Sequence, residues 1–377
     1  MTKDKVHPFY KSENIRNAFN KVFNEGDWWK YKSERTIILE ERFAQYHDSK
    51  FGISVCNGSV ALDVILKSLE IKNGDEIILP AYDYYYLPKS VINSGAVPVF
   101  ADVCDNNFTL DSNDIDKRIT RKTKAIIAVH ISSSVAQMDR IKQIAKDNEL
   151  TLIEDCAQAH GAIYGNKKVG SWGDVSLFSF GGIKLMTSGQ GGMIITSNED
   201  LYNKMFSLVN RGLLSDGSMN KFGIIGDNYQ LSELQAALLL PQLEMLDEYC
   251  NKREKAIRYL DDNLKEIKGV SVLKQFEKTG RRAQMRYSFC LESNNAIDNT
   301  NRDFFIDELQ KRGYSISGGH SVIRNDERLQ GYFNKVGSFP NAQKAEDEIV
   351  SLYHTFLLNE FNEIDELIKD IKNIMNN

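Results

Sequence analysis

Seven short apolar runs, separated by stretches with helical periodicity, constrain the fold of this 377-residue chain more than any other feature. Each run is rich in Val, Ile or Phe and mostly uncharged, as is typical of strands that are buried on both faces. Strands that alternate with helices in this way predict an α/β layer fold with a largely parallel sheet. The runs cover residues 52–56, 76–79, 97–101, 125–129, 150–153, 175–180 and 193–196.

Helical periodicity outside these runs predicts two domains. A long helical region from residue 228 to about residue 264, with Pro241 inside it, is typical of an element that connects domains. After it come a β-rich run and two helices, which indicate a smaller α+β domain. We expect a large domain with an N-terminal arm over residues 1–245 and a small domain over residues 246–377. The other expected helices cover residues 14–25 (with Phe19, Val22 and Phe23 on one face), 38–46, 59–69, 139–146 and 303–312.

The composition argues against several classes of protein. Lys and Arg number 47 against 52 Asp and Glu, a net charge of −5, whereas nucleic-acid-binding proteins usually carry a basic excess. The five cysteines are widely spaced and form no Cys-x-x-Cys pair, which favours reduced thiols and argues against a zinc site. We expect no signal peptide, and no apolar stretch approaches the roughly 18 residues that span a bilayer. We therefore expect a cytoplasmic protein without a metal or a membrane partner.

An acidic pair follows one of the apolar runs. Glu154 and Asp155 open the segment Glu-Asp-Cys-Ala-Gln-Ala-His-Gly at residues 154–161. The carboxyl end of a parallel strand is the edge at which α/β proteins bind ligands, so this pair is a candidate for a ligand site. The alternative is that Asp155 simply caps a helix.

A glycine-rich loop with one lysine follows another run. Ser179 begins the segment Ser-Phe-Gly-Gly-Ile-Lys, which ends at Lys184, and Ser-Gly-Gln-Gly-Gly at residues 188–192 follows. A lysine amine becomes a nucleophile towards aldehydes when burial or a neighbouring charge lowers its pKa. Glycines allow a bulky cofactor to approach the backbone. The alternative is a tight turn that carries a surface lysine.

The third candidate is a turn of small residues before an expected helix. Cys-Asn-Gly-Ser-Val at residues 56–60 joins a strand to that helix. Amides at a helix N-terminus bind anions, and Ser59 adds a hydroxyl group. The turn is neither a Walker A loop nor a Gly-x-Gly-x-x-Gly fingerprint. The alternative is an ordinary Ser N-cap.

Together these three segments supply an anion cradle, an aldehyde-reactive amine and a carboxylate. Pyridoxal 5′-phosphate needs such a set, because it carries a phosphate, an aldehyde and a ring nitrogen that must stay cationic. The chain resembles the DegT-type (DegT/StrS) sugar aminotransferases from about Trp28 to the C-terminus. The two most specific matches are Ser-Phe-x-x-x-Lys-x-x-x-x-Gly-x-Gly-Gly at residues 179–192 and Glu-Asp-x-Ala-x-Ala-His-Gly at residues 154–161.

The resemblance implies an aspartate aminotransferase-like α/β fold of PLP fold type I. In that fold, a large domain with a mixed, mostly parallel seven-stranded sheet carries a smaller α+β C-terminal domain. Lys184 would form the Schiff base and move protons, and Asp155 would pair with the pyridine nitrogen. Gln158 would contact the phenolic oxygen of the cofactor. The remaining cofactor contacts implied are Gly58, Ser59, Val60 and Ser179 at the phosphate, Tyr84 stacked on the ring, and Asn228 from the second subunit of a homodimer.

Several of these positions leave alternatives open. Tyr84 lies among Tyr82, Tyr85 and Tyr86, so the choice of the ring that stacks on the cofactor stays open, and the alternative for Tyr84 is a packing residue in this tyrosine-rich loop. Gln190 stands where the family usually has glutamate. Gln230 stands where it usually has arginine, which removes a positive charge near the phosphate or the substrate entrance. The loop at residues 130–134 also lacks the glycine that commonly follows its histidine.

Two segments bear on the substrate. Gly-Asp-Trp-Trp, which contains Trp28, and Ser-Gly-Gly-His, which ends at His320, resemble the family branch that acts on inososes and related keto-polyols. On this resemblance Trp28 and His320 would contact the substrate. The alternatives are a hydrophobic anchor for the N-terminal arm and a solvated loop histidine.

We therefore predict a PLP-dependent aminotransferase that moves an amino group from glutamate or glutamine to a keto-sugar, either nucleotide-linked or of the free keto-polyol type. The expected pathway is amino-sugar, polysaccharide or antibiotic biosynthesis. One alternative is a sugar dehydratase with the same cofactor. In the branch of the family that this alternative resembles, a histidine replaces the lysine. A small phosphorylated ketone is an alternative acceptor. A homologue without turnover would lack the lysine or the aspartate, and both are present.

Overall fold

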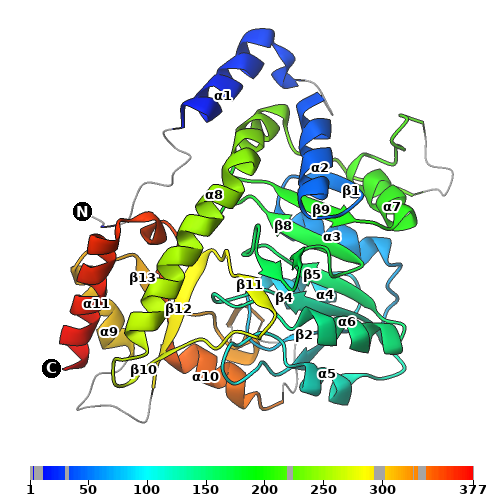
Figure 1. Ribbon diagram of the computed structural model, residues 1–377. Helices are drawn as coiled ribbons and strands as arrows, with labels where there is room; N and C mark the ends of the chain where they lie inside the picture. Colours follow the sequence, from blue (N-terminus) through cyan, green and yellow to red (C-terminus); the bar gives the residue numbers. More distant parts are fainter. Residues whose placement is uncertain are drawn as a thin grey trace.

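The computed structural model describes residue 3 and residues 12–29, 34–218, 224–292, 302–325, 327–329 and 337–376. Its largest element is a seven-stranded sheet with the strand order β1-β9-β8-β5-β4-β2-β3 (Figure 1). Each of the seven apolar runs forms one of these strands, so the α/β fold class predicted from the sequence is confirmed. The strands are β1 (Phe51–Val55), β2 (Glu76–Pro80), β3 (Val97–Ala101), β4 (Thr123–Val129), β5 (Thr151–Asp155), β8 (Val175–Ser179) and β9 (Gly192–Thr196).

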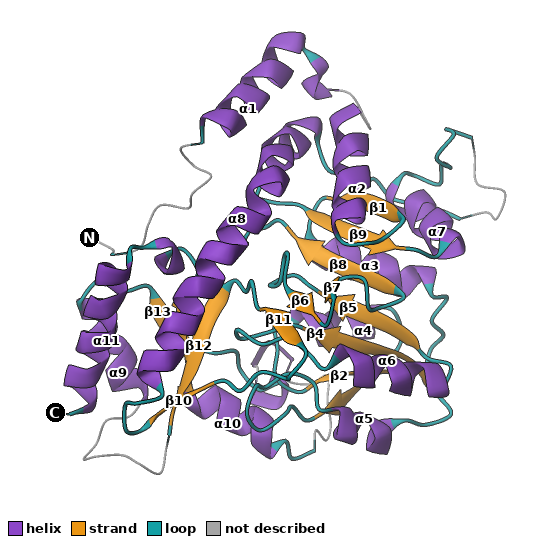
Figure 2. Ribbon diagram, viewed as in Figure 1, coloured by secondary structure: helices purple, strands orange, loops and turns teal. Residues whose placement is uncertain are grey.

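Both faces of this sheet are buried, which explains why its strands are continuously apolar. In β2, Ile77 and Leu79 belong to one hydrophobic core, whereas Ile78 between them belongs to the other. Side chains alternate across a strand, so each face needs its own covering layer. Helices α3 (Gly58–Ser68), α4 (Tyr86–Asn93) and α7 (Glu199–Val209) contribute to the first core, and α2 (Glu34–Tyr46), α5 (Ser112–Arg118), α6 (Met138–Asp147) and α8 (Glu233–Leu264) to the second (Figure 2).

The strand directions bring several loops to one edge of the sheet. Strands β2, β4, β5 and β8 are parallel, while β9 runs antiparallel to β8 and to β1. The carboxyl ends of β1, β2, β5 and β8 therefore share an edge with the start of β9. Ligands bind at this edge in open α/β sheets. All three sequence segments singled out above reach it.

The long helix α8 runs from the large sheet to a second, smaller sheet (Figure 1). Ala236 and Leu246 of α8 lie in the core behind the large sheet, and Leu260 lies in the core of the C-terminal part. The helix begins at Glu233, not at residue 228, because the side chains of Ser232 and Gln235 form a capping box there. Pro241 lies in the first third of α8 and does not end it.

The C-terminal part is built on a four-stranded antiparallel sheet with the order β10-β12-β14-β13. A third sheet, β11-β6-β7, has three short strands. The elements are β6 (Ile163–Tyr164), β7 (Lys167–Lys168), β10 (Val270–Val272), β11 (Thr279–Arg281), β12 (Arg286–Leu291), α9 (Arg302–Lys311), β13 (Ile316–Gly318), α10 (Pro340–Glu348), β14 (Ile349–Tyr353) and α11 (Phe361–Met375).

Helix α1 (Glu13–Glu25) packs against α8 at the upper end of the molecule (Figure 1). The expected apolar face is only partly correct, since Val22 is buried with Ile15 while Phe19 and Phe23 are 37% and 63% exposed. The buried stripe is narrow because α1 meets one neighbouring helix and not a layer. In the described part of the chain, no helix combines the length and the apolar character needed to cross a membrane.

Candidate active site

A cavity of about 650 Å³ opens at the shared edge of the large sheet. Nine of the predicted site residues line it: Gly58, Ser59, Val60, Tyr84, Asp155, Gln158, Ser179, Lys184 and His320. They come from the ends of β1, β2, β5 and β8 and from the segment after β13. The cavity therefore combines the strand edge of the large sheet with one wall from the small domain.

The N-terminus of α3 forms the floor of an anion site. Asn57 caps this helix, and its Oδ1 accepts the Val60 amide at 2.8 Å. The Val60 amide is thus already used, whereas Gly58 and Ser59 begin the helix, where no helical carbonyl can reach their amides. Ser179 lies against this turn, because a Cβ on Gly58 would come within 2.8 Å of the Ser179 Cβ. Two hydroxyl groups and the start of a helix thus converge, which suits a phosphate.

Lys184 lies at the wall of the cavity, in the loop that follows β8. Burial lowers the pKa of its amine, while the charges of Asp155 and Asp83 raise it and that of Arg286 lowers it further. The net direction is downward, so the neutral, nucleophilic form is easier to reach than in a solvated lysine.

Asp155 is the last residue of β5, and its carboxylate faces the same cavity. Its Oδ1 accepts the Ala157 amide at 2.8 Å. Burial raises the pKa of Asp155 above its usual value, while the Ala157 amide and the charge of Lys184 act in the opposite direction. A carboxylate in this setting is stabilised by a cation brought into the cavity.

Three further predicted residues surround the space between these charges. The ring of Tyr84 is half exposed and packs edge-on against Tyr85, with the ring centres 4.6 Å apart. Nε2 of Gln158 lies 3.5 Å from Nε2 of His320. Burial, with the nearby charges of Arg286 and Lys184, lowers the pKa of His320 to about 3, so its imidazole is neutral.

Two charged residues that sequence reasoning missed also line the cavity: Asp83, after β2, and Arg286, at the start of β12. Nη1 of Arg286 donates to Ser317 Oγ at 2.7 Å. Asp83 follows an apolar run just as Asp155 does, so its position was a signal in the sequence. Arg286 carried no such signal, since only the packing of the small domain brings it here.

Asn228 and Trp28 do not line the cavity. Asn228 is exposed and forms a β-bridge with Asn210. Trp28 lies in the short 3-10 helix η2 (Asp27–Trp29) and is 49% exposed. The side chain of Gln230 donates to Asn210 and forms part of the loop that supports Asn228.

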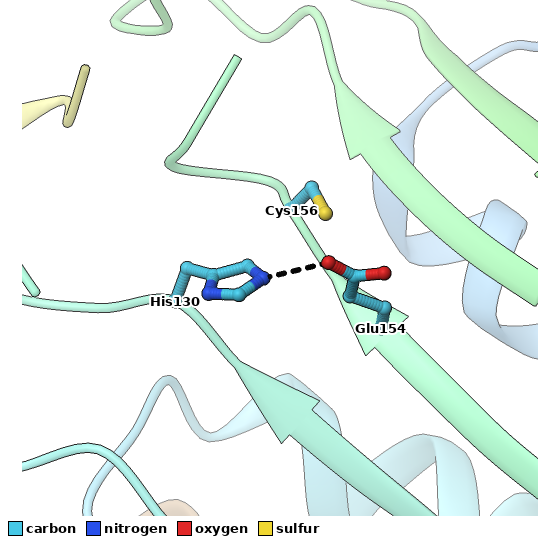
Figure 3. Close-up of side chains that lie close together, drawn as sticks. All are labelled: His130, Glu154 and Cys156. Carbon is cyan, nitrogen blue, oxygen red and sulfur yellow. Dashed lines mark hydrogen bonds and ion pairs between the residues drawn. The ribbon is translucent and has the colours of Figure 1, made fainter. Parts of the chain in front are cut away.

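A second cluster of ionisable groups lies beneath the site. His130, Glu154 and Cys156 are fully buried and point at one another (Figure 3). His130 Nε2 lies 3.0 Å from Glu154 Oε1, and its Nδ1 accepts the Ala136 amide, which fixes a neutral ring that donates to Glu154.

The remaining lone pairs of Glu154 are also occupied. They accept the amides of Gly170, Trp172 and Gly173 at 2.7–3.0 Å. Burial alone would raise the pKa of Glu154, but the hydrogen bonds from His130 and from the amides of Gly170 and Gly173 bring it below its usual value. The carboxylate is therefore saturated by hydrogen bonds and acts as a structural clamp, which leaves no lone pair for a metal ion.

Comparison with known proteins adds to this geometry. The profile of the DegT/DnrJ/EryC1/StrS aminotransferase family matches residues 10–372. The L-glutamine:scyllo-inosose aminotransferase of Streptomyces griseus is 31% identical over 89% of this chain and 84% of its own. The GDP-perosamine synthase of Caulobacter vibrioides is 37% identical over 74% of each chain. The X-ray structure of an aminotransferase from Psychrobacter cryohalolentis superposes with a TM-score of 0.91 at 28% identity and covers 98% of both chains.

Proposed function

Because the chain belongs to the DegT/DnrJ/EryC1/StrS aminotransferase family, we propose that it moves an amino group from glutamate or glutamine to a keto-sugar or keto-polyol. The relatives support this acceptor class, since one is named for an inosose and another for a GDP-linked amino sugar. The observation that carries the proposal is the convergence of Lys184, Asp155 and the start of α3 on one cavity.

Pyridoxal 5′-phosphate is the cofactor, and the residues of the cavity fit it. The fit is seen at Gly58, which has no room for a side chain beside Ser179, so the start of α3 and the Ser179 hydroxyl group border one part of the cavity. It is also seen at Asp155, where burial raises the pKa of the carboxyl group, so that a cation in the cavity would stabilise its charged form. When bound, the cofactor supplies an electron sink that stabilises negative charge on the carbon bearing the amino group.

The predicted residues of the cavity would bind different parts of the cofactor. Gly58, Ser59 and Ser179 hold the phosphate, and Val60 shapes the turn through its bond to Asn57. Asp155 holds the ring nitrogen as a cation, and Tyr84 and Gln158 fix the plane of the ring. Lys184 holds the aldehyde carbon and, once released, takes a proton from the donor carbon and returns it at the neighbouring position.

His320 and Trp28 are the proposed substrate contacts. His320 lies beside Gln158 at the wall from the small domain, where its neutral imidazole can bond a sugar hydroxyl group. Trp28 would act across a subunit interface, since it is exposed in its own chain. Because Lys184 is retained, aminotransfer is favoured over dehydration.

The proposal extends to the assembly and the setting of the enzyme. We place Asn228 in the active site of the second subunit of a homodimer, because it is exposed and outside the cavity of its own chain. We place the domain boundary at residue 245, within α8, the helix that contributes to both cores; along it, Cys250 is the last residue of the large-sheet core and Ala256 the first of the C-terminal core. The five cysteines are free, which suits the cytoplasm.

A substrate screen tests the function. The purified protein, loaded with cofactor, is offered glutamate or glutamine together with nucleotide-linked keto-sugars, free inososes or a small phosphorylated ketone. We expect amine transfer to at least one sugar or inosose acceptor, detected as the amino product by mass spectrometry. Exclusive use of the phosphorylated ketone, or loss of a hydroxyl group without amine transfer, would overturn the proposal.

A further inference from the structure

Asp83, like Arg286, is a charged residue of the cavity for which the proposed function has no role. Its side chain is 6% exposed and lines the cavity. Its Oδ1 accepts the Tyr84 amide at 2.6 Å. Its Oδ2 is buried and has no hydrogen-bond partner among the described residues. A buried carboxylate oxygen left in this state is costly unless a cation or a donor meets it.

The charged groups around Asp83 come from several elements. The other charged residues that line the cavity are Asp155 at the end of β5, Lys184 after β8 and Arg286 at the start of β12, and the neutral His320 lines it too. Burial and then the charge of Asp155 raise the pKa of Asp83 well above its usual range, whereas the charge of Lys184 lowers it. In turn, Asp83 and Asp155 are the two groups that raise the pKa of Lys184. Asp83 and Lys184 therefore lie within each other's electrostatic field.

The two carboxyl groups differ in what they can do once the cofactor is bound. Asp155 is engaged by the cationic ring nitrogen, and the charge of such a pair largely cancels at a distance. Asp83 follows a different strand, β2, and no cationic atom of the cofactor is assigned to it. Among the carboxyl groups that line the cavity, it is the one left to act on the amine of Lys184.

We propose that Asp83 is a positioning residue for Lys184, and that its unpartnered Oδ2 holds the amine as an ammonium ion whenever Lys184 carries the proton of the transfer. This inference rests on the proposed function, because only there must the lysine gain and lose that proton. Asp83 and Lys184 then share one proton, either as a carboxylate beside an ammonium ion or as a carboxylic acid beside a neutral amine. The proton comes from the donor carbon and returns to the product, so Asp83 is unchanged at the end of the cycle.

The first experiment measures the pKa of Lys184 in the full chain after removal of the cofactor. Acetic anhydride reacts only with neutral amines, so brief pulses across a pH series, with the Lys184 peptide quantified by mass spectrometry, give the midpoint. Asp83→Asn keeps the acceptor for the Tyr84 amide and removes the charge. We expect the midpoint to fall by about one to three pH units, the effect of losing one opposite charge at short range.

The second experiment uses the cofactor-loaded protein. Protonation of the nitrogen that joins Lys184 to the cofactor moves its absorption band, so a spectral titration gives a second midpoint. Asp83→Asn should lower this midpoint too, because the variant lacks the carboxylate that stabilises the protonated form. Asp83→Glu restores the charge and should return both midpoints towards the wild-type values.

Asp63→Asn is the matched control. The Asp63 carboxylate in α3 accepts the hydroxyl group of Tyr86, the first residue of α4, at 2.8 Å, but Asp63 does not line the cavity. The Asp63→Asn variant should leave both titration midpoints unchanged. If Asp83→Asn fails to fold, Asp83→Ser carries the same expectation. A variant without the Asp83 charge that keeps the wild-type midpoint in the cofactor-free chain overturns the inference and limits Asp83 to bonding the Tyr84 amide.

The two proposals fail separately. Absence of amine transfer to any keto-sugar or keto-polyol by the wild-type protein would overturn the proposed function and leave the measured effect of Asp83 on the amine in place. Loss of transamination in Lys184→Ala, together with an unshifted midpoint in Asp83→Asn, would overturn only the role of Asp83.

Discussion

His130 Nε2 lies 3.0 Å from Glu154 Oε1, and the next peptide bond leads to Asp155. The site carboxylate is therefore held by a neighbour that is itself fixed by a buried histidine and three backbone amides. These bonds to Glu154 form a structural clamp for the strand end that carries Asp155.

Removal of the clamp should cost stability. We expect His130→Ala to lower the free energy of unfolding by about 2–4 kcal/mol, because a buried carboxylate loses a donor and a cavity forms. Urea unfolding of the cofactor-free protein measures the loss. His320→Ala is the control, since its ring borders a cavity, and we expect a loss below about 1 kcal/mol. Equal losses in the two variants would show that the bond to Glu154 contributes little.

Replacement of Lys184 tests the chemistry directly. We expect purified Lys184→Ala to bind cofactor without covalent attachment, to carry no covalently fixed cofactor after treatment with borohydride and to lose transamination by at least about 1,000-fold, since general acid–base and covalent catalysis are both removed. The wild-type protein should be yellow and lose its colour with borohydride. Lys204→Ala, which removes a surface partner of Glu70, should behave like the wild type. Transamination by Lys184→Ala at the wild-type rate would remove that residue from the mechanism.

Much of this architecture could be predicted from the sequence because burial on both faces leaves a strong pattern. The strand expected at residues 150–153 is found as β5 at Thr151–Asp155, and the loop that carries Lys184 follows β8 as expected. Local motifs also placed Ser59, Asp155 and Lys184 on one edge of the sheet, since the ends of parallel strands meet there.

Other features depended on packing between distant segments. Arg286 reaches the cavity from the small domain, and no local pattern encodes that contact. Helix α1 exposes Phe23 because its partner is a single helix, which a periodic apolar stripe does not reveal. The unpartnered oxygen of Asp83 is visible only once its surroundings are known.

The close contact between Gly192 and the turn at residues 57–58 predicts that Gly192 does not tolerate a side chain. A Cβ on Gly192 would lie 2.7 Å from the Asn57 carbonyl carbon and 2.9 Å from the Gly58 nitrogen, both backbone atoms that cannot move aside. We expect Gly192→Ala to weaken cofactor binding at least about tenfold, equivalent to roughly 1.4 kcal/mol, by displacing the start of α3. Equilibrium dialysis measures the affinity. Gly182→Ala, whose Cβ would meet no atom within 4 Å, should bind normally; equal weakening in both would contradict this explanation.

Buried His47 predicts a loss of stability in acid. Burial lowers the pKa of His47 to about 3, and its Nδ1 bonds the Val169 carbonyl oxygen at 2.8 Å. As the pH falls below about 6.5, His47 becomes protonated in the unfolded chain but stays neutral in the folded chain. The contribution of His47 to the free energy of unfolding is therefore complete above pH 6.5 and is lost as the pH falls towards 3. We expect His47→Asn, which can keep the bond to Val169, to reduce the slope of unfolding free energy against pH by about 1.4 kcal/mol per unit between pH 6 and 4. An unchanged slope would assign the acid sensitivity to other groups.

Mixed dimers test whether Asn228 acts in the second subunit. Asn228 is exposed and outside the cavity of its own chain, so Asn228→Ala should impair only the site of its partner. In a dimer of one Lys184→Ala chain and one Asn228→Ala chain, one site then has both residues intact. Random mixing of equal amounts should restore about a quarter of the wild-type sites. If Asn228 serves its own chain, both sites of the mixed dimer are defective and activity stays at the average of the parents, so recovery after mixing decides between the two arrangements.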